Sequence, residues 1–452
     1  MQKVCFRPWL VAACGVLSAL LPATVAANTL CVNPAGYGGC YSTIQAAVNG
    51  ASAYDLINVG PGTYSEQVVI GIPVSIIGAG AESSVIDATN LAHGIFVDGY
   101  DYAGLRDVTI RGLTVRNALF EGVLVVSARN VTISDSRVVD NDKSPGLQFT
   151  GATEACPDQP GNGIYETDET GDCGGGIHLV GTVDAVVSGN LLTGNADGIL
   201  ISDETAESYN NLVLNNVVSK NALECGIVLA SHPPAGHTSR PYAVHNGVDH
   251  NVVAGNLSSE NGVQIGGSGV GLFSDGNGQG RVTGNVVVNN KLIGNGLAGV
   301  ALHSHVGPAF DLPADDMAGN KIIGNYIAKN LADQGDTATP GTVGININSG
   351  GGGSPVYGTV ISQNVIEDED VDIAVNTPAE VYIHLNNLQG RKVGVADVCV
   401  YDKASVCTGA IDATENYWGC SAGPGNDGCT TASGSDIRFV PWLRRRVDEH
   451  RY

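Results

Sequence analysis

Pairs of asparagines five residues apart recur along the chain and limit its fold more than any other feature. The pairs are Asn190 with Asn195, Asn216 with Asn221, Asn256 with Asn261, Asn290 with Asn295 and Asn325 with Asn330; Ser136 with Asn141 comes before them and Asn364 with Glu369 after them. From Asn190 on, successive pairs start 26, 40, 34, 35 and 39 residues apart, so a unit of roughly 23–26 residues carries insertions of varying length. A repeat of this period indicates a solenoid, in which each unit contacts only its neighbours.

A second motif lies between the asparagine pairs: glycine, an aliphatic residue, any residue and an apolar residue. It begins at Gly94, Gly122, Gly146, Gly176, Gly198, Gly226, Gly269, Gly299 and Gly344. Its alternation predicts short strands with one face inward, and Gly and Asn suit the sharp turns between strands. We therefore predict an all-β fold, a right-handed single-stranded parallel β-helix whose coils stack ~4.8 Å apart. The repeats along the chain then form one cooperative stack, and we do not expect several separate domains.

The two ends of such a stack expose unpaired strand edges and need covers. Residues 41–48 have helical spacing and predict an amphipathic helix as N-terminal cap. The disulfide-rich tail, with Trp418 and Trp442, predicts the C-terminal cap. We expect a signal peptide over residues 1–27, an N-terminal cap over 28–60, the β-helix over 61–395, and a C-terminal cap and tail over 396–452.

The N-terminal segment predicts export from the cytoplasm. Lys3 and Arg7 precede an apolar run from Trp9 to Leu21, and Val25-Ala26-Ala27 places small residues before a cleavage site. No other stretch has the ~18 uninterrupted apolar residues that a membrane span needs. We expect a secreted protein, extracellular or periplasmic, with no membrane span.

The cysteines agree with an oxidising compartment. Of the 11 cysteines, Cys5 and Cys14 would leave with the signal peptide. Eight of the others form close pairs that predict local disulfides: Cys31 with Cys40, Cys156 with Cys173, Cys399 with Cys407, and Cys420 with Cys429. Cys225 stands alone in an apolar run, as a buried thiol does.

Several segments resemble those of a known superfamily. The segments 42–49, 55–64 and 74–80 together resemble the N-terminal cap and first coils of the pectin-lyase-like superfamily. Asn416-Tyr-Trp-Gly-Cys-Ser-Ala-Gly-Pro-Gly425, followed by Pro441-Trp-Leu443, resembles the closing motif of secreted bacterial right-handed β-helix repeat proteins. The resemblance implies a carbohydrate-related setting, because many relatives are polysaccharide lyases, hydrolases, esterases or epimerases.

The resemblance carries over no catalytic residues. Gly62-Thr-Tyr-Ser-Glu66 matches one pectinesterase motif, but the paired-aspartate and arginine motifs of that family are missing. The characteristic motifs of polygalacturonases and alginate epimerases are missing too. Since a fold alone does not determine function, the reaction has to be argued from the residues of this chain.

The charge balance narrows the range of partners. The chain has 22 basic and 45 acidic residues, a formal net charge of −23. Such a surface disfavours nucleic acid and anionic membranes, and it repels polyuronates unless calcium or local arginines compensate. We expect a polysaccharide or glycan as partner, no nucleic acid, and a monomer.

The insertions predict where the chemistry lies. They follow the strands of the glycine motif, at 203–210, 231–247, 274–280, 304–318 and 349–358, so they would emerge from one corner and form a wall of a lateral groove. Extending the strand register gives a column of Glu204, His232, Asp275 and His305, ~4.8 Å from one another. Alternating carboxylates and imidazoles can exchange protons, and we predict these four as catalytic residues. The competing interpretation is a solvated polar face.

Neighbouring residues predict substrate and ion contacts. His303 stands two residues before His305, and the loop after His232 holds His237, Arg240 and Tyr242. Arg240 would bind a carboxylate and Tyr242 would stack on a sugar ring. Asp311, Asp315 and Asp316 are candidate calcium ligands; calcium is the one cofactor that the sequence suggests.

Three functions remain open at this point. The first is glycan cleavage, by hydrolysis or elimination, with Glu204 and Asp275 as the acid–base pair about 10 Å apart, near the separation of inverting hydrolases. The second is a non-catalytic extracellular module that binds a glycan or a partner. The third is metal handling in the periplasm, through His303, His305, His232 and Asp275, since imidazole and carboxylate suit zinc or copper.

Overall fold

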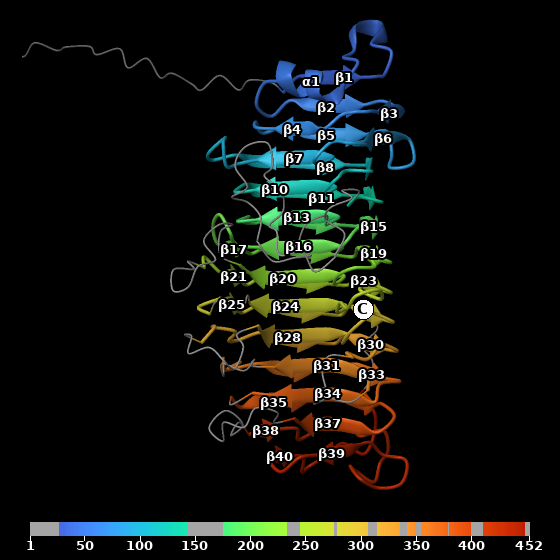
Figure 1. Cartoon of the computed structure of the whole chain (residues 1–452), viewed down its shortest axis with the longest axis vertical. Coiled ribbons are helices and arrows are strands. Elements are labelled where there is room, and N and C mark those ends of the chain that lie inside the picture. Colours follow the sequence, from blue (N-terminus) through green and yellow to red (C-terminus); the bar gives the residue numbers. More distant parts are fainter. Residues whose placement is uncertain are drawn as a thin grey trace, which may run out of the picture.

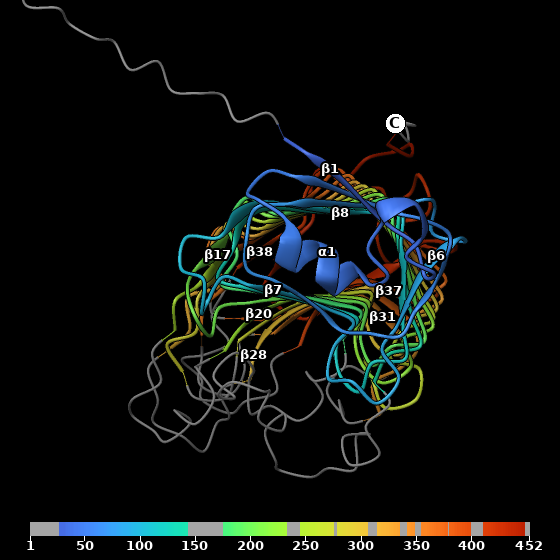
Figure 2. The same cartoon turned by 90° about the horizontal axis from the view of Figure 1, so that it is seen from above.

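A computed structural model describes residues 27–142, 175–232, 245–274, 278–305, 314–334, 341–348, 354–377, 379–398 and 410–447. The strands stack into a tall column whose coils follow the sequence from one end to the other (Figure 1). Viewed along the stack, the strands superimpose into a tube with flattened sides (Figure 2). The predicted parallel β-helix is confirmed.

Sheet A has 14 strands. In order they are β1 (Thr29–Val32), β2 (Leu56–Val59), β5 (Ser75–Gly78), β8 (Arg106–Arg111), β11 (Arg129–Ser134), β14 (Val186–Ser188), β18 (Leu212–Leu214), β22 (Val252–Ala254), β26 (Val286–Val288), β29 (Lys321–Ile323), β32 (Val360–Ser362), β35 (Val381–His384), β38 (Ile411–Asp412) and β40 (Ile437–Arg438).

Sheet B has 11 strands. They are β3 (Gly62–Tyr64), β6 (Ser84–Asp87), β9 (Thr114–Arg116), β12 (Arg137–Val139), β15 (Leu191–Thr193), β19 (Val217–Ser219), β23 (Leu257–Ser259), β27 (Lys291–Ile293), β30 (Tyr326–Ala328), β33 (Val365–Glu367) and β36 (Asn387–Gln389).

Sheet C has 12 strands and contains the glycine motifs. Its strands are β4 (Val68–Ile70), β7 (Ile95–Asp98), β10 (Val123–Val126), β13 (Ile177–Val180), β16 (Ile199–Ser202), β20 (Ile227–Ser231), β24 (Val270–Ser274), β28 (Val300–Ser304), β31 (Val343–Asn348), β34 (Val371–Asn376), β37 (Val393–Asp397) and β39 (Thr431–Ser433). A short sheet D joins β17 (Ser208–Tyr209), β21 (Val248–Asp249) and β25 (Val282–Thr283).

The core is a set of apolar columns that run along the inside of the tube. In sheet C, one column passes through Ile199, Ile227, Val270 and Val300, which are partners on successive strands and are fully buried. Burying such a side chain stabilises the fold by about 1.5–3 kcal/mol. Since every side chain in a column packs on the coils before and after it, the column stabilises the stack as a whole.

The asparagine pairs form two buried ladders beside the core. Asn216 donates from Nδ2 to Oδ1 of Asn256 at 3.0 Å, and Asn256 does the same to Asn290 at 2.9 Å. In the second ladder Asn330 ends the run by donating to Glu369 Oε1 at 3.0 Å. These side chains satisfy the backbone groups at each turn, which would otherwise be buried without partners.

Helix α1 (Ile44–Gly50) lies across the N-terminal opening of the tube (Figure 2). Ile44 and Ala47 face the core and are fully buried. Glu66 accepts hydrogen bonds from the backbone N–H groups of Ile44, at 2.8 Å, and Gln45, at 2.9 Å. The glutamate of the pectinesterase-like motif therefore caps the helix that closes the stack.

The C-terminal cap centres on Trp418, which is fully buried and meets Phe439 edge-on with ring centroids 6.1 Å apart. Next to it the Cys420–Cys429 disulfide is formed. At the other end the Cys31–Cys40 disulfide ties β1 to a 3₁₀-helix, η1 (Tyr37–Gly39). These two predicted disulfides are confirmed.

The other two predicted disulfides stay predictions, because their cysteines lie outside the described residues. One would join Cys156 and Cys173, and the other would join Cys399 and Cys407. Cys225 is buried and takes no part in a disulfide among the described residues, and its sulfur accepts the backbone N–H of Ser268 at 3.1 Å.

In the part of the chain described above, no helix is long and apolar enough to cross a membrane.

Candidate functional site

From β7 to β20 the outer face of sheet C differs from an ordinary solvent-facing surface because its side chains are buried. Phe96, Leu124, His178 and Leu200 are partners on successive strands and project from this face. Leu124 and Leu200 are fully buried, and Leu124 belongs to an apolar cluster separate from the core. Polar side chains within this face are therefore removed from water.

Glu204 and His232 lie side by side on this face. The register pairs Ser202, at the end of β16, with Ala230 in β20, so the residues two positions further on meet as predicted. Nδ1 of His232 is 3.5 Å from Oε1 of Glu204, and both residues are 2% exposed. The prediction placed them on an open groove wall, but the structure buries them, because they share a face with apolar columns.

The carboxylate of Glu204 is unusual in its bonding. Neither oxygen has a hydrogen-bond partner among the described residues, and both are buried. The 3.5 Å contact between Glu204 Oε1 and His232 Nδ1 is longer than an ordinary hydrogen bond. Burying a carboxylate without hydrogen bonds costs several kcal/mol, so each such group in a native protein calls for an explanation.

Three further buried groups extend this site toward the N-terminus. Nε2 of His178 lies 2.8 Å from the hydroxyl oxygen of Ser202. His93 Nδ1 lies 2.6 Å from Glu121 Oε2, and both side chains are almost fully buried. We refer to Glu204, His232, His178, Glu121 and His93 as the acid–histidine cluster.

The cluster behaves as one electrostatic unit. Burial lowers the pKa of His178, while the carboxylates of Glu204 and Glu121 act in the opposite direction. His232 and His93 lower that pKa further. His178 is therefore neutral near pH 7, with a lone pair available on one ring nitrogen.

Asp203 supports the cluster from the adjacent position. Its carboxylate accepts the backbone N–H of His232 at 2.7 Å, the backbone N–H of Gly247, and the hydroxyl of Ser231 at 3.1 Å. Burial, and then the carboxylate of Glu204, raise the pKa of Asp203 to about 6. Asp203 thus fixes the backbone that carries His232.

Beside the acid–histidine cluster runs a buried column of serines. Ser231, Ser274 and Ser304 are partners on successive strands. At the far end Asp315 accepts hydrogen bonds from the hydroxyls of Ser274 and Ser304, and from the backbone N–H of Gly280 at 2.9 Å. Asp315 lies at the end of this serine column, and both of its carboxylate oxygens accept hydrogen bonds there.

The calcium role of Asp311, Asp315 and Asp316 stays a prediction. Asp315 is buried and its neighbour Asp316 is exposed. Asp311 lies outside the described residues. Among the residues that the structure describes, no group of three or more His, Cys, Asp or Glu side chains is placed to hold a metal ion.

His303 and His305 form a second pair on the same face. Their Nε2 atoms are 2.7 Å apart, and the ring of Phe273 lies against His303 with centroids 4.4 Å apart. Burial and the neighbouring His305 lower the pKa of His303 well below its usual value. By strand spacing His305 lies about 10 Å beyond His232. Of the predicted column, the structure therefore pairs Glu204 with His232, and His305 with His303, which lies outside the column.

The remaining predicted residues are outside the described part of the chain. Asp275, the predicted partner of Glu204, is one of them, as are His237, Arg240 and Tyr242.

The sequence prediction missed His93, Glu121 and His178. A signal for His178 existed, because it occupies the variable position of the glycine motif, where the preceding and following strands carry Leu124 and Leu200. A histidine among leucines in one column marks a polar group that the fold has to bury. His93 and Glu121 each precede a motif glycine, a position that no periodicity marked.

The fold and its comparisons with known proteins agree. Residues 93–269 match the family model described as a right-handed β-helix region. No curated protein matches the sequence. The catalytic unit of the thermostable GH87 α-1,3-glucanase from Streptomyces thermodiastaticus strain HF3-3 is 14% identical, with a TM-score of 0.50, over 90% of this chain and 67% of that one.

Two more solved structures share the architecture. The catalytic domain of a GH87 α-1,3-glucanase variant in complex with tetrasaccharides is 14% identical, with a TM-score of 0.57, over 91% of this chain and 67% of that one. The pre-mature gene product 12 of bacteriophage phi29 is 11% identical, with a TM-score of 0.53, over 80% of this chain and 45% of that one. The chain thus has the fold of a right-handed parallel β-helix, which the family model describes and these solved structures share.

Proposed function

We propose that the chain is a secreted polysaccharide-active protein that cleaves glycans on the outer face of sheet C. The observation that carries this proposal is the buried carboxylate of Glu204, which lacks hydrogen bonds and faces the imidazole of His232 at 3.5 Å. The fold supports the substrate class, because a solved structure of similar fold is a GH87 α-1,3-glucanase in complex with tetrasaccharides.

Hydrolysis needs an acid for the leaving oxygen and a base for water. In our proposal Glu204 gives its proton to the glycosidic oxygen as the bond between that oxygen and the anomeric carbon breaks. A water oxygen bonds to the anomeric carbon in its place, and the proton of that water passes to a second carboxylate, which releases it to solvent. His232 then passes a proton from solvent to Glu204 and so restores the acid. Asp275 is the proposed base, because its position in the predicted column is about 10 Å from Glu204, near the separation of inverting enzymes.

Net charge supports a neutral substrate. With a formal charge of −23, the protein repels polyuronates, and elimination from those substrates favours a lysine or arginine base. The acid–histidine cluster contains neither. Neutral glycans, including α-1,3-glucan, are therefore the first substrates to test.

The test is product release from a panel of neutral and acidic polysaccharides by the wild type, Glu204→Gln and Glu207→Gln. The matched control, Glu207, is partly exposed and pairs with Arg281. We expect Glu204→Gln to lower the rate by about 100-fold or more, and Glu207→Gln to leave it unchanged. Equal rates for all three proteins, or binding without release of product from any glycan, would contradict the proposal; the latter result supports a binding module.

A further inference from the structure

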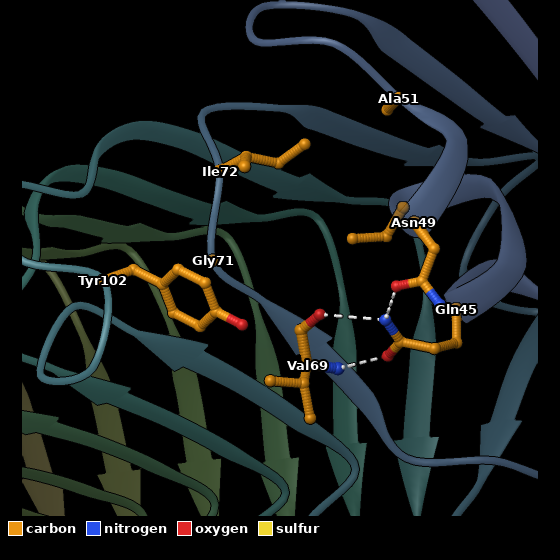
Figure 3. A pocket seen from close by; sticks show the side chains of 8 residues that line it. Gln45, Asn49, Ala51, Val69, Gly71, Ile72 and Tyr102 are labelled. Carbon is orange, nitrogen blue, oxygen red and sulfur yellow. Dashed lines mark hydrogen bonds between the residues drawn. The ribbon is translucent and has the colours of Figure 1, made fainter.

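A pocket opens where helix α1 meets the first strands of sheet C. Its volume is about 260 Å³, and its walls include Gln45, Asn49, Val69, Gly71, Ile72 and Tyr102 (Figure 3). Pockets for drug-sized ligands measure about 300–1,000 Å³. This one therefore suits a single ring rather than an oligomer.

Tyr102 forms one wall and is held in place. Its ring packs against Gly71 so closely that a Cβ atom on that residue would come within 2.5 Å of the ring. Asp98 fixes the loop by accepting the backbone N–H groups of Tyr100, at 3.1 Å, and Asp101, at 2.9 Å. Tyr102 is nevertheless 53% exposed, so a rigid aromatic surface faces the solvent.

The opposite wall is a fixed pair of amides. Gln45 accepts the backbone N–H of Val69 at 2.6 Å and donates to the Val69 carbonyl at 3.2 Å. It also donates to Oδ1 of Asn49 at 2.8 Å, and Figure 3 shows this network facing the tyrosine across the pocket. None of the residues that line the pocket carries a charge.

The pocket lies on the same face as the acid–histidine cluster. Val69, Phe96, Leu124 and His178 are partners on successive strands, so Val69 is about 14 Å from His178 along the stack. A linear chain that follows the stack would pass both places.

We propose that this pocket binds one neutral pyranose ring of a glycan chain, as a subsite remote from the acid–histidine cluster. The C–H groups on one face of a pyranose match the electron-rich face of Tyr102, and its hydroxyls match the amides and the phenol oxygen. No lining residue carries a charge that would pair with an ionic ligand, which favours a neutral ring. The choice of a glycan as ligand rests on the proposed function. The existence of the pocket and its uncharged lining do not depend on that proposal.

The test uses Glu204→Gln protein, so that no substrate is consumed, with tyrosine rings labelled for NMR. The probes are an α-1,3-glucan tetrasaccharide, cellotetraose, and tetragalacturonate as the acidic control. We expect a neutral probe to shift the Tyr102 ring signal, which is identified by its loss in Tyr102→Ala. Tyr102→Ala and Gly71→Ala should weaken binding about tenfold, while Tyr102→Phe should stay within about threefold because it keeps the ring.

Tyr357→Ala is the matched control, since Tyr357 is exposed in a coil far from the pocket. Its affinity for the neutral tetrasaccharides should equal that of the Glu204→Gln protein without further substitution. Equal affinity in Tyr102→Ala, or a preference for tetragalacturonate, would overturn the proposal. If no glycan is cleaved by the wild type but Tyr102-dependent binding persists, the proposed catalysis fails and the pocket stands.

Discussion

Asn216 and Asn256 are forty residues apart in sequence, yet the side-chain amide of the first donates to Oδ1 of the second at 3.0 Å. The same oxygen accepts the backbone N–H of Asn216 at 2.9 Å. One side chain therefore satisfies two buried donors of the neighbouring coil. The same relationship recurs from coil to coil along the ladder and holds these coils in register.

Asn256→Ala should destabilise the stack by about 4 kcal/mol, because it leaves two donors of Asn216 without acceptors in a buried turn. The measurement is the midpoint of denaturant unfolding, together with hydrogen exchange in the coils of β18 and β26. The control is Asn58→Ala, at an exposed position of β2, which should change the midpoint little. Equal midpoints for the two variants would show that the ladder does not stabilise the turns.

Asp372→Asn should stabilise the protein above pH 4. Asp372 Oδ2 accepts the backbone N–H of Gly390 at 3.1 Å, and burial together with Glu369 raises the pKa of Asp372 well above its ordinary value. As the pH rises past 4, Asp372 ionises in the unfolded chain but keeps its proton in the folded chain. The free energy of unfolding therefore falls by about 1.4 kcal/mol for each pH unit until the folded group also ionises.

Asparagine keeps the acceptor and does not ionise, so the melting temperature at pH 8 should rise by about 2 °C or more. At pH 4 the variant and the wild type should melt within about 1 °C of each other. A gain of the same size at both values would mean that the effect is not due to ionisation.

The pKa of His178 should report on Glu204. Burial lowers this pKa, and the negative charge of Glu204 partly offsets the effect. In Glu204→Gln the offset is lost, so the pKa of His178 should fall further. Histidine-labelled protein titrated by NMR gives the value, with Glu207→Gln as control. A rise in the pKa of His178 in Glu204→Gln would contradict the electrostatic coupling.

Loss of the Cys31–Cys40 disulfide should loosen the N-terminal cap alone. The bond closes a short loop, with a sequence separation of 9, and a loop of this size stabilises by about 2.5 kcal/mol. In the double variant Cys31→Ser, Cys40→Ser, hydrogen exchange should accelerate in β1 and η1 and stay unchanged in β24. Faster exchange throughout the stack would show that the cap controls the stability of every coil.

Much of the fold followed from sequence because its constraints are local and repeated. The asparagine spacing predicted the stack, and the asparagines form the two ladders that end at Asn416 and Glu369. A third ladder runs from Asn211 through Asn251 to Asn285. Each of its members stands five residues before the first asparagine of a pair, so the same spacing contained it, but the prediction used only two asparagines per coil.

The candidate site followed only in part. Register alone placed Glu204 opposite His232, because parallel strands that pair at one position also pair at the next. Strand register does not determine burial, and the same two residues on a solvated face would have no unusual chemistry. Strand register also gave no reason to place His93 and Glu121 in one cluster with Glu204 and His232.

The sequence by itself determined the periodicity, the strand register, the helix cap and the disulfides at the two ends, since each arises from residues close in the chain or one repeat apart. Only the tertiary structure decided that the outer face of sheet C is buried from β7 to β20 and that five ionisable side chains from five coils lie together there. Burial depends on what packs against a face from elsewhere in the molecule, and no local pattern records that.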